Sequence, residues 1–293
     1  MQGFIIKSIS GDFHVYCNQT SKTYVCKARG QIRSKKLLPV CGDEVLFSFD
    51  ENNNFALITD ILPRKNQLIR PPVANVDIAL IVMSTIKPNF DSYLVDKLIT
   101  SATMENIEPI IVVSKCEFVD EELKSLLDNY KSAGYCVIEV SSHNNINIDK
   151  VEQIIAGKKV ILCGQSAVGK SSLINSLLKD NSRKIGDFSE KLGRGRHETR
   201  EVEFININNA YVADSPGFSR LDIKIELTSF ARVFKDFNKL ANNCRFNTCL
   251  HKDEPNCAVK KAVDEGIIDS RRYSNYLHLM NEIKDGKHVW RKK

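Results

Sequence analysis

Short apolar runs alternate with turn residues over the first sixty positions of the chain. Five such runs cover residues 4–6, 13–16, 23–26, 44–47 and 56–58. Glycine, asparagine and aspartate, which favour turns, lie between several of them. Regularly spaced short strands of this kind are typical of small closed sheets. The pattern therefore predicts an N-terminal five-stranded β-barrel of the OB-like type.

The pattern of apolar positions changes after Pro71-Pro72. Continuous apolar runs now alternate with stretches whose apolar positions repeat at helical spacing. The runs cover residues 78–83, 110–113, 136–140 and 159–163, and the helical stretches cover residues 93–104 and 121–133. Strands that are connected through helices form parallel sheets with both faces covered. The pattern therefore predicts an α/β domain, to which residues 202–207 and 211–213 add two strands.

The last part of the chain is predicted to be helical. Five apolar side chains fall on one face of a single helix: Leu227, Phe230, Phe234, Phe237 and Leu240. A second helix is predicted over residues 269–283. We therefore expect three domains, which are the barrel over residues 1–68, the α/β domain over residues 69–220 and a helical domain over residues 221–293.

Composition excludes several classes of protein. Of the 293 residues, 42% are apolar and 27% are charged, which excludes a disordered chain or a fibre. The net charge of +6 permits an anionic partner without requiring one. No apolar run approaches the roughly 20 residues that cross a membrane, and no secretory signal is visible at the start. We therefore expect a cytoplasmic protein with no membrane partner.

Cationic residues are concentrated in one predicted loop of the barrel. Five of the ten residues from position 27 to position 36 are lysine or arginine. Dense cationic side chains neutralise phosphates, so this composition is typical of a loop that follows a nucleic-acid backbone. A solvated surface loop is the alternative.

A phosphate-binding motif, G-x-x-x-x-G-K-S, begins at Gly164. It follows an apolar strand and precedes an apolar helical run, which is the context that such a loop requires. The glycines let backbone N–H groups face the phosphates, Lys170 reaches the terminal phosphates as a candidate catalytic residue, and Ser171 binds Mg²⁺. The candidate nucleotide-binding residues here are Gly164, Gln165, Ser166, Ala167, Val168, Gly169, Lys170, Ser171 and Ser172.

Two later segments fit nucleotide hydrolysis. An apolar strand ends in Asp214-Ser215-Pro216-Gly217, where Asp214 would hold Mg²⁺ through water and the Gly217 N–H would sense the γ-phosphate. Residues 191–200 are glycine-rich and basic, which is typical of a switch segment, and Thr199 is the candidate second Mg²⁺ ligand. A plain surface loop is the alternative for the second segment.

Candidates for base recognition precede the phosphate loop. One strand ends in Ser114-Lys115-Cys116-Glu117, and another ends in Ser141-Ser142. GTPases use N-K-x-D or T-K-x-D at such a strand end, so Ser114 and Glu117 both depart from that pattern. Glu117 keeps the carboxylate that accepts from guanine, Lys115 can lie along the base, and Ser141-Ser142 could bring a backbone N–H near O6. Guanine is favoured over adenine.

A compact set of metal-binding side chains lies near the C-terminus. The spacing C-x₄-C-x-H-x₅-C supplies three thiolates and one imidazole, from Cys244, Cys249, His251 and Cys257. Four such ligands suit tetrahedral Zn²⁺ and leave no position open for water, which indicates a structural metal. On spacing alone, buried cysteines without a metal are the alternative. Five flanking cations fit either RNA contact or a solvated face: Lys252, Lys260, Lys261, Arg271 and Arg272.

The motifs stand in a permuted order, because the base-recognition segments precede the phosphate loop while Thr199 and Asp214 follow it. With the barrel in front and the cysteines behind, the chain resembles the ribosome small-subunit-dependent GTPase family RsgA, also called YjeQ, over essentially its whole length. The resemblance is carried by residues 70–77, 88–90, 164–171, 195–200, 214–218 and 244–259. Glu198 and Ser215 depart from the family pattern, since each stands where threonine is usual.

The resemblance implies a GTP hydrolase that uses GTP or GDP, Mg²⁺ and one structural Zn²⁺. It implies binding to the small (30S) ribosomal subunit and its rRNA in late assembly, with hydrolysis that the subunit stimulates and that is coupled to release. Nothing in the sequence argues against a monomer.

Phe218 stands where many GTPases carry the glutamine that orients the attacking water, so slow intrinsic hydrolysis is predicted. His197 is the candidate catalytic residue that would act when a partner orders the switch. An RNA or packing contact is the alternative role for His197.

Two rival functions remain open at this point. One is a nucleotide-switched RNA-binding protein with negligible turnover. The other is a P-loop ATPase, which only Ser114 and Glu117 suggest. A small-molecule kinase is disfavoured, because no acceptor pocket or lid motif is recognisable.

Overall fold

The computed structural model describes residues 1–28, 38–51, 53, 55–69, 71–178, 202–214 and 225–285. The chain divides into two compact units. The first unit comprises Met1–Ala79, Val151–Cys163 and Ile174–Phe218, and the second comprises Leu80–Lys150, Gly164–Leu173 and Ser219–Lys293. Each unit combines separate stretches of chain, so the domain boundaries at residues 68 and 220 stay a prediction.

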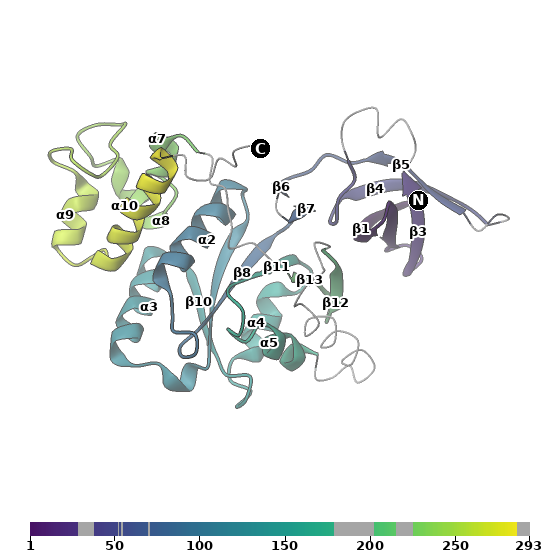
Figure 1. Ribbon diagram of the computed structural model, residues 1–293, viewed down its shortest axis with the longest axis horizontal. Coiled ribbons are helices and arrows are strands. Elements are labelled where there is room, and N and C mark those ends of the chain that lie inside the picture. The colour runs from purple at the N-terminus through teal and green to yellow at the C-terminus, as the bar shows by residue number, and fades with distance from the viewer. Residues whose placement is uncertain are drawn as a thin grey trace. The chain divides into compact units, whose positions relative to one another are not determined.

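The N-terminal strands close into a barrel in the order β1-β2-β3-β5-β4, drawn in purple in Figure 1. They are β1 (Gln2–Ile9), β2 (Asp12–Cys17), β3 (Lys22–Ala28), β4 (Glu44–Asp50) and β5 (Phe55–Ile61). Strands β3 and β5 are parallel, and the other pairs are antiparallel. Phe13, Val15 and Cys17 alternate into the core along β2, as the period of two requires. The predicted five-stranded barrel is confirmed.

A small antiparallel pair, β6 (Gln67–Ile69) and β7 (Pro72–Ala74), follows the barrel. The first unit also contains β11 (Lys159–Cys163), β12 (Phe204–Ile207) and β13 (Ala210–Asp214). Strand β13 is parallel to β11 and antiparallel to β12. Because the two-residue turn at Asn208 and Asn209 has positive φ at both positions, it joins β12 and β13 as a hairpin. The sheet that contains β11, β13 and β12 is therefore mixed, whereas the sequence predicted a parallel sheet.

Six of the described strands form one sheet in the order β10-β9-β8-β11-β13-β12. The second unit contributes β9 (Glu108–Ser114), β10 (Cys136–Val140) and most of β8 (Ile78–Ser84), whose seven residues are all buried. The helices α2 (Ser92–Met104) and α3 (Glu121–Ala133) begin at the capping carboxylates of Asp91 and Asp120. The other elements here are η1 (Cys116–Phe118), α4 (Ile148–Ile155) and α5 (Lys170–Leu177).

Residues 225–285, the described part of the C-terminal region, contain four helices: α7 (Leu227–Phe230), α8 (Lys235–Ala241), α9 (Ala258–Asp264) and α10 (Ser270–Lys284). The prediction of one helix through Leu227 and Leu240 is wrong, since α7 and α8 are separate. The chain is extended at Phe234, with φ −76° and ψ 133°, and the Ala231 carbonyl between the helices accepts from the His251 ring. The bend still buries Phe230, Phe234 and Phe237 around Tyr276.

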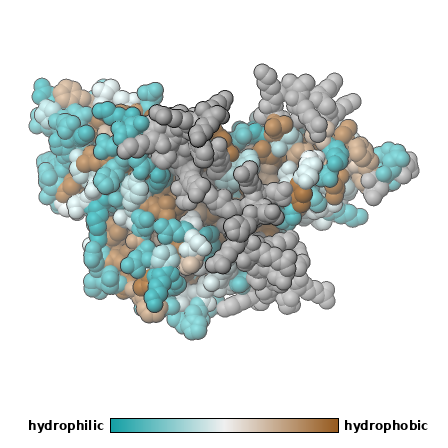
Figure 2. Space-filling view, viewed as in Figure 1, coloured by the Kyte–Doolittle hydropathy of each residue, from teal (hydrophilic) through white to brown (hydrophobic). Residues whose placement is uncertain are grey.

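Helix α10, yellow in Figure 1, packs against α2. Lys97 of α2 donates to Glu282 of α10 at 2.8 Å, and Tyr93 bonds the same carboxylate. Hydrophilic residues cover most of the visible face of the C-terminal helices in Figure 2, and apolar ones are scattered. No helix among the described residues has the length and apolar character needed to span a bilayer.

Candidate functional site

The phosphate loop joins the end of β11 to the start of α5. Gly164 has φ +134° and Gly169 has φ +97°, conformations that L side chains rarely adopt. A Cβ at Gly164 would lie 2.2 Å from the Val82 carbonyl oxygen, and one at Gly169 would lie 3.3 Å from Ser114 Oγ. Gly164 is therefore required by close approach as well as by backbone conformation, and Gly169 is required by its backbone conformation.

Lys170 lies over the loop that it follows. Its Nζ donates to the carbonyl oxygens of Gly164 and Gln165, each at 2.8 Å. Ser166, Ala167 and Ser171 are exposed, so the loop is open to solvent on this side. A curled glycine-containing loop at a helix start, with a lysine across it and an accessible serine, fits a nucleoside phosphate with Mg²⁺.

Ser114, the last residue of β9, forms a hydrogen bond with the phosphate loop. Ser114 is 5% exposed, and its Oγ donates to the Val168 carbonyl at 2.5 Å. This contact engages the Ser114 hydroxyl, and a role of Ser114 in base recognition stays a prediction. The sequence held no local signal for the contact, because the two residues are 54 positions apart.

Lys115 and Glu117 lie in the turn after β9. Lys115 has φ 57°, and its Nζ donates to the carbonyl oxygens of Ile86 at 2.8 Å and Lys87 at 3.1 Å. The Lys115 carbonyl accepts from Thr85 Oγ1 at 2.9 Å. Glu117, in η1, is exposed. The turn is thus fixed by the lysine while the glutamate carboxylate remains accessible.

At the end of β10, Ser141 is buried, and its N–H and hydroxyl both form hydrogen bonds within the loop that follows. Its N–H donates to the Ile146 carbonyl at 3.2 Å, and its Oγ accepts from the Asn144 N–H at 3.2 Å. Ser142 is half-buried. The backbone N–H of Ser142, rather than that of Ser141, is therefore the donor to consider for a base.

Asp214 is the last residue of β13 and pairs with Leu162 of β11, two positions before the phosphate loop begins. Several predicted residues lie outside the described part of the chain, namely His197, Thr199, Gly217 and the rest of residues 191–200, together with most of the basic loop over residues 27–36. Their roles stay predictions.

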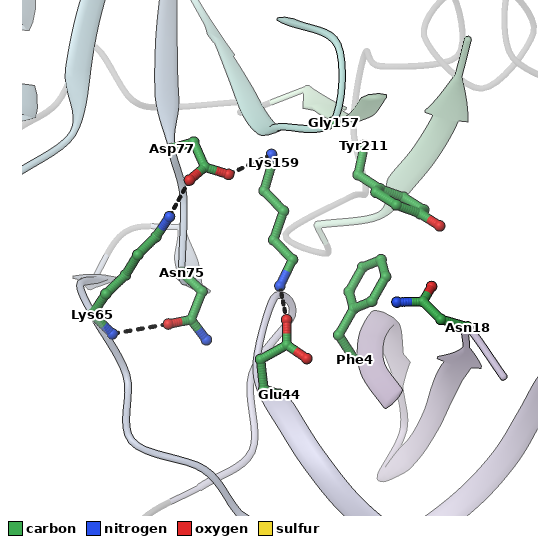
Figure 3. A pocket seen from close by; sticks show the side chains of 9 residues that line it. All are labelled: Phe4, Asn18, Glu44, Lys65, Asn75, Asp77, Gly157, Lys159 and Tyr211. Atoms are coloured by element: carbon green, nitrogen blue, oxygen red, sulfur yellow. Dashed lines mark hydrogen bonds and ion pairs between the residues drawn. The ribbon is translucent and has the colours of Figure 1, made fainter. Parts of the chain in front are cut away.

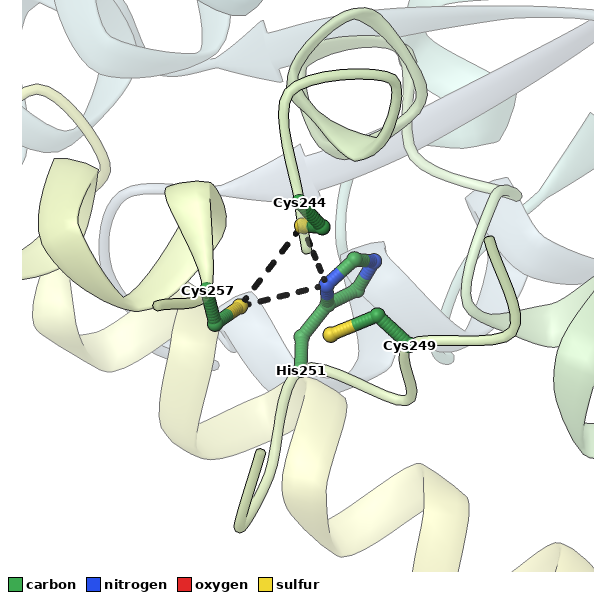
Figure 4. A group of neighbouring side chains, drawn as sticks. All are labelled: Cys244, Cys249, His251 and Cys257. Atoms are coloured by element: carbon green, nitrogen blue, oxygen red, sulfur yellow. Dashed lines mark hydrogen bonds between the residues drawn. The ribbon is translucent and has the colours of Figure 1, made fainter. Parts of the chain in front are cut away.

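Three cysteines and one histidine converge at the C-terminal region, as Figure 4 shows. The ligand atoms of Cys244, Cys249, His251 and Cys257 all lie within 4.8 Å of one another. Cys244 Sγ is 3.9 Å from Cys257 Sγ, and His251 Nδ1 is 3.6 Å and 3.4 Å from the two sulfurs. Zinc–sulfur bonds of about 2.3 Å in a tetrahedron place sulfurs about 3.8 Å apart. The cluster therefore has the dimensions of a zinc site.

The chemistry of the cluster also fits a metal ion. His251 Nε2 donates to the Ala231 carbonyl at 3.2 Å, which leaves the Nδ1 lone pair for the side that faces the Cys244 and Cys257 sulfurs. Burial raises the pKa of the Cys249 thiol to about 12, and burial lowers the pKa of His251. A divalent cation offsets the cost of holding thiolates in this buried place.

Neighbouring side chains fix the loop that carries these ligands. The Glu254 carboxylate accepts from the backbone N–H groups of Leu250 at 2.7 Å and Lys252 at 2.9 Å. Tyr273 donates to the His251 carbonyl and Tyr276 to the Leu250 carbonyl, each at 2.7 Å. The loop is therefore ordered by protein contacts around the ligand atoms.

Arg272, one of the five flanking cations, belongs to the core and not to a surface. It is 0% exposed, donates to Asp236 at 2.6 Å and lies over the Tyr130 ring. Its Nε is 3.7 Å from Asp96 of α2, which also accepts from Tyr130. Both interpretations of Arg272 from the sequence were wrong, because the acidic partners come from distant segments.

Family models and individual relatives identify the same family for this chain. The RsgA N-terminal domain family matches residues 2–58, and the RsgA GTPase family matches residues 61–224. A small ribosomal subunit biogenesis GTPase RsgA from Caldanaerobacter subterraneus subsp. tengcongensis is 42% identical, with 97% of this chain and 96% of that protein covered. The protein of the same name from Enterococcus faecalis is 38% identical over 100% of this chain and 99% of its own.

Two solved structures resemble the chain over nearly its whole length. YloQ, described as a circularly permuted GTPase, has a TM-score of 0.81 and 32% identity, with 97% of this chain and 95% of YloQ covered. YjeQ from Thermotoga maritima has a TM-score of 0.80 and 29% identity, with 97% and 98% covered. The order of motifs along this chain matches that description.

Proposed function

The chain belongs to the RsgA family of GTPases, and we propose that it hydrolyses GTP to GDP and phosphate on the small (30S) ribosomal subunit during late assembly of that subunit. The observation that carries this is the glycine loop between β11 and α5, crossed by Lys170, with the Lys115 turn coming earlier in the chain. The relatives are small ribosomal subunit biogenesis GTPases by name, and this supports the ribosomal part of the proposal.

The nucleotide's phosphates would contact the loop from Gly164 to Ser172, with Lys170 Nζ moving from the Gly164 and Gln165 carbonyls to the phosphate oxygens. Ser171, Thr199 and Asp214 would hold Mg²⁺, which supplies charge neutralisation when bound. The Gly217 N–H would contact the γ-phosphate. The exposure of Ser171 and the position of Asp214 at the end of β13 support these roles.

Guanine recognition would use the exposed Glu117 carboxylate, the Lys115 stem and the Ser142 N–H. Ser114 would act on the phosphate loop instead of the base, because its hydroxyl is bonded to Val168. Competition of GDP and ADP against a fluorescent guanine nucleotide tests this. A GDP preference of at least 100-fold is expected, and equal competition would favour the ATPase alternative.

Water activation would fall to His197, since Phe218 cannot orient water. Replacing His197 with alanine should abolish subunit-stimulated turnover and leave GDP affinity unchanged. The matched control is His278→Ala, because His278 is an exposed histidine on α10. Unchanged stimulated turnover in the His197 variant would remove that residue from the mechanism.

The C-terminal cluster would hold one structural Zn²⁺ through Cys244, Cys249, His251 and Cys257. All four tetrahedral positions are then filled by protein, so the metal would stabilise the helices around it. The barrel with its basic loop and the C-terminal region would contact rRNA. We also propose that the protein works as a cytoplasmic monomer, in keeping with a ribosomal partner.

Phosphate release from GTP and from ATP, each with and without purified small subunits, tests the function directly. Stimulation by subunits with GTP alone is the expected result. A second assay under single-turnover conditions separates a true GTPase from a nucleotide-switched RNA-binding protein, which would bind GTP and subunits without measurable turnover. That outcome, or equal use of ATP, would overturn the proposed function.

A further inference from the structure

A pocket of about 370 Å³ lies where barrel residues meet the amino ends of β11 and β13, all within the first compact unit. Figure 3 shows Glu44 and Phe4 of the barrel facing Lys159 of β11 and Tyr211 of β13. Nothing in the nucleotide mechanism uses these four side chains. The charges in the pocket are already paired, which argues against an anionic ligand.

Lys159 binds the barrel from the first position of β11. Its Nζ forms an ion pair with Glu44 of β4 and lies 4.5 Å from the centre of the Phe4 ring. Its backbone N–H donates to Asp77 Oδ2 at 2.7 Å. The Lys159 side chain is 13% exposed, so its cation is held largely away from water.

Tyr211 binds the barrel from the neighbouring strand. It pairs in register with Lys159, and its ring lies 4.5 Å from the Phe4 ring and 5.9 Å from the Tyr16 ring. The hairpin partner β12 is attached as well, because Glu203 beside it forms both an ion pair at 2.7 Å and a β-bridge with Lys7 of β1. The register shift between Ile5 and Lys7 lies beside that bridge.

The opposite ends of the same two strands carry the candidate nucleotide groups. Leu162 of β11 pairs with Asp214 of β13, and Cys163 leads directly into the phosphate loop. Each strand has five residues, so the barrel contact and the nucleotide end are separated by about 13 Å of hydrogen-bonded strand. Because β11 and β13 are hydrogen-bonded in register from Lys159 to Leu162, a shift of their barrel ends would move their opposite ends as well.

We propose that Lys159 and Tyr211 are positioning residues, through which the barrel sets the phosphate loop and Asp214 relative to each other. Through these strands, a change at the barrel alters how the site distinguishes GTP from GDP. This inference rests on the proposed GTPase function. A half-buried ion pair at a strand end contributes little stability by itself, so its value here lies in fixing position.

The test measures the ratio of affinities for a non-hydrolysable GTP analogue and GDP in the full-length protein, without subunits. Lys159→Met keeps the apolar stem and removes the cation, and it should change this ratio at least threefold. Glu44→Gln should act in the same direction, and the double variant should be no worse than either single variant. Lys159→Arg keeps the ion pair and should restore the original ratio. Tyr211→Leu tests the second strand in the same way.

The matched control is Lys65→Met. Lys65 lines the same pocket, and its ammonium pairs with Asp77 instead of with a residue of the barrel. In Lys65→Met, the ratio of the affinities for the GTP analogue and GDP should equal that of the unmodified protein within experimental error. If Lys159→Met and Tyr211→Leu lower the unfolding midpoint while the ratio stays constant, the contacts are only structural and the inference is overturned.

A failure of the proposed function can be distinguished from a failure of the inference about Lys159 and Tyr211. The proposed function fails if the unmodified protein shows no GTP turnover with subunits. The inference is decided by nucleotide affinities alone, which need neither subunits nor turnover.

Discussion

The phosphate loop and the cysteine cluster are both candidate ligand sites, yet the groups that they offer to a ligand differ. The loop between β11 and α5 presents mainly backbone groups, and its shape follows from Gly164 and Gly169 within one strand-loop-helix unit. The cluster presents four side chains on an irregular loop between short helices. A backbone site is therefore complete when the sheet folds, whereas buried thiolates, unlike neutral buried thiols, need a cation to be stable.

The largest expected effect separates the two sites. Cys257→Ser removes one ligand of the cluster and should lower the free energy of unfolding of the C-terminal region by several of the roughly 10 kcal/mol that a structural zinc supplies. Zinc content and far-UV circular dichroism measure the change, and GDP affinity should be nearly unchanged. Cys136→Ser, on β10 and outside the cluster, is the control. Equal loss of GDP binding would show that the sites are not independent.

The phosphate loop should respond in the opposite way. Lys170→Ala removes the cation that reaches the phosphates and should weaken GDP binding about 100-fold, or about 3 kcal/mol, because charged hydrogen bonds to phosphate are lost. Zinc content and the unfolding midpoint should not change. Titration with a fluorescent nucleotide measures the affinity, and Lys124→Ala, on the exposed face of α3, is the control. A loss under threefold would contradict the assigned role.

Gly164→Ala tests whether the loop depends on backbone shape. The added Cβ would meet the Val82 carbonyl at 2.2 Å and φ is +134°, so we expect a loss of about 2–3 kcal/mol in the free energy of unfolding, together with weaker nucleotide binding. Chemical denaturation measures it. Gly266→Ala is the control, because its φ is +71° and a Cβ there meets nothing within 4 Å, so only about 1 kcal/mol is expected.

A pH-dependent prediction concerns the buried polar contacts between α2 and the C-terminal helices. Burial raises the pKa of the Asp96 carboxyl to about 6, despite Arg272, Tyr130 and Asn275 beside it, with Asp236 adding negative charge. The folded pKa is above the ordinary 3.8, so this contribution to stability is full below pH 4 and is lost as pH rises through 6.

Between pH 4 and pH 7 the free energy of unfolding should therefore fall by on the order of 2 kcal/mol relative to Asp96→Asn, in which this group does not titrate. Denaturant titrations of both proteins across that range measure the difference. Parallel curves would contradict the raised pKa of Asp96.

The smallest expected effect concerns the link between the Lys115 turn and the phosphate loop. Ser114→Ala removes the 2.5 Å hydrogen bond to the Val168 carbonyl and should cost about 1 kcal/mol of stability, with a small loss of GDP affinity. Guanine preference over adenine should be unchanged, because the hydroxyl is hydrogen-bonded to the phosphate loop. If the variant loses its preference for guanine, Ser114 takes part in base recognition.

Much of this molecule was predictable because its signals are local. The alternation along β2, the glycines and lysine of the phosphate loop, and the close spacing of Cys244, Cys249, His251 and Cys257 each lie within a short stretch. Backbone conformation, strand period and ligand count are properties of such stretches. The sequence alone therefore determined the barrel, the phosphate loop, the cluster of three cysteines and one histidine, and the permuted order of the GTPase motifs.

Only the tertiary structure decided which distant groups meet. It placed Arg272 among Asp96, Asp236 and Tyr130, although its neighbours in sequence suggested a surface. It also divided the predicted single helix, because α7 ends at Phe230 and the carbonyl of the next residue, Ala231, accepts a hydrogen bond from His251. These outcomes depend on burial and on pairing between segments, and a buried charge or carbonyl has to find its partner wherever the fold brings one. No pattern within a single segment carries that information.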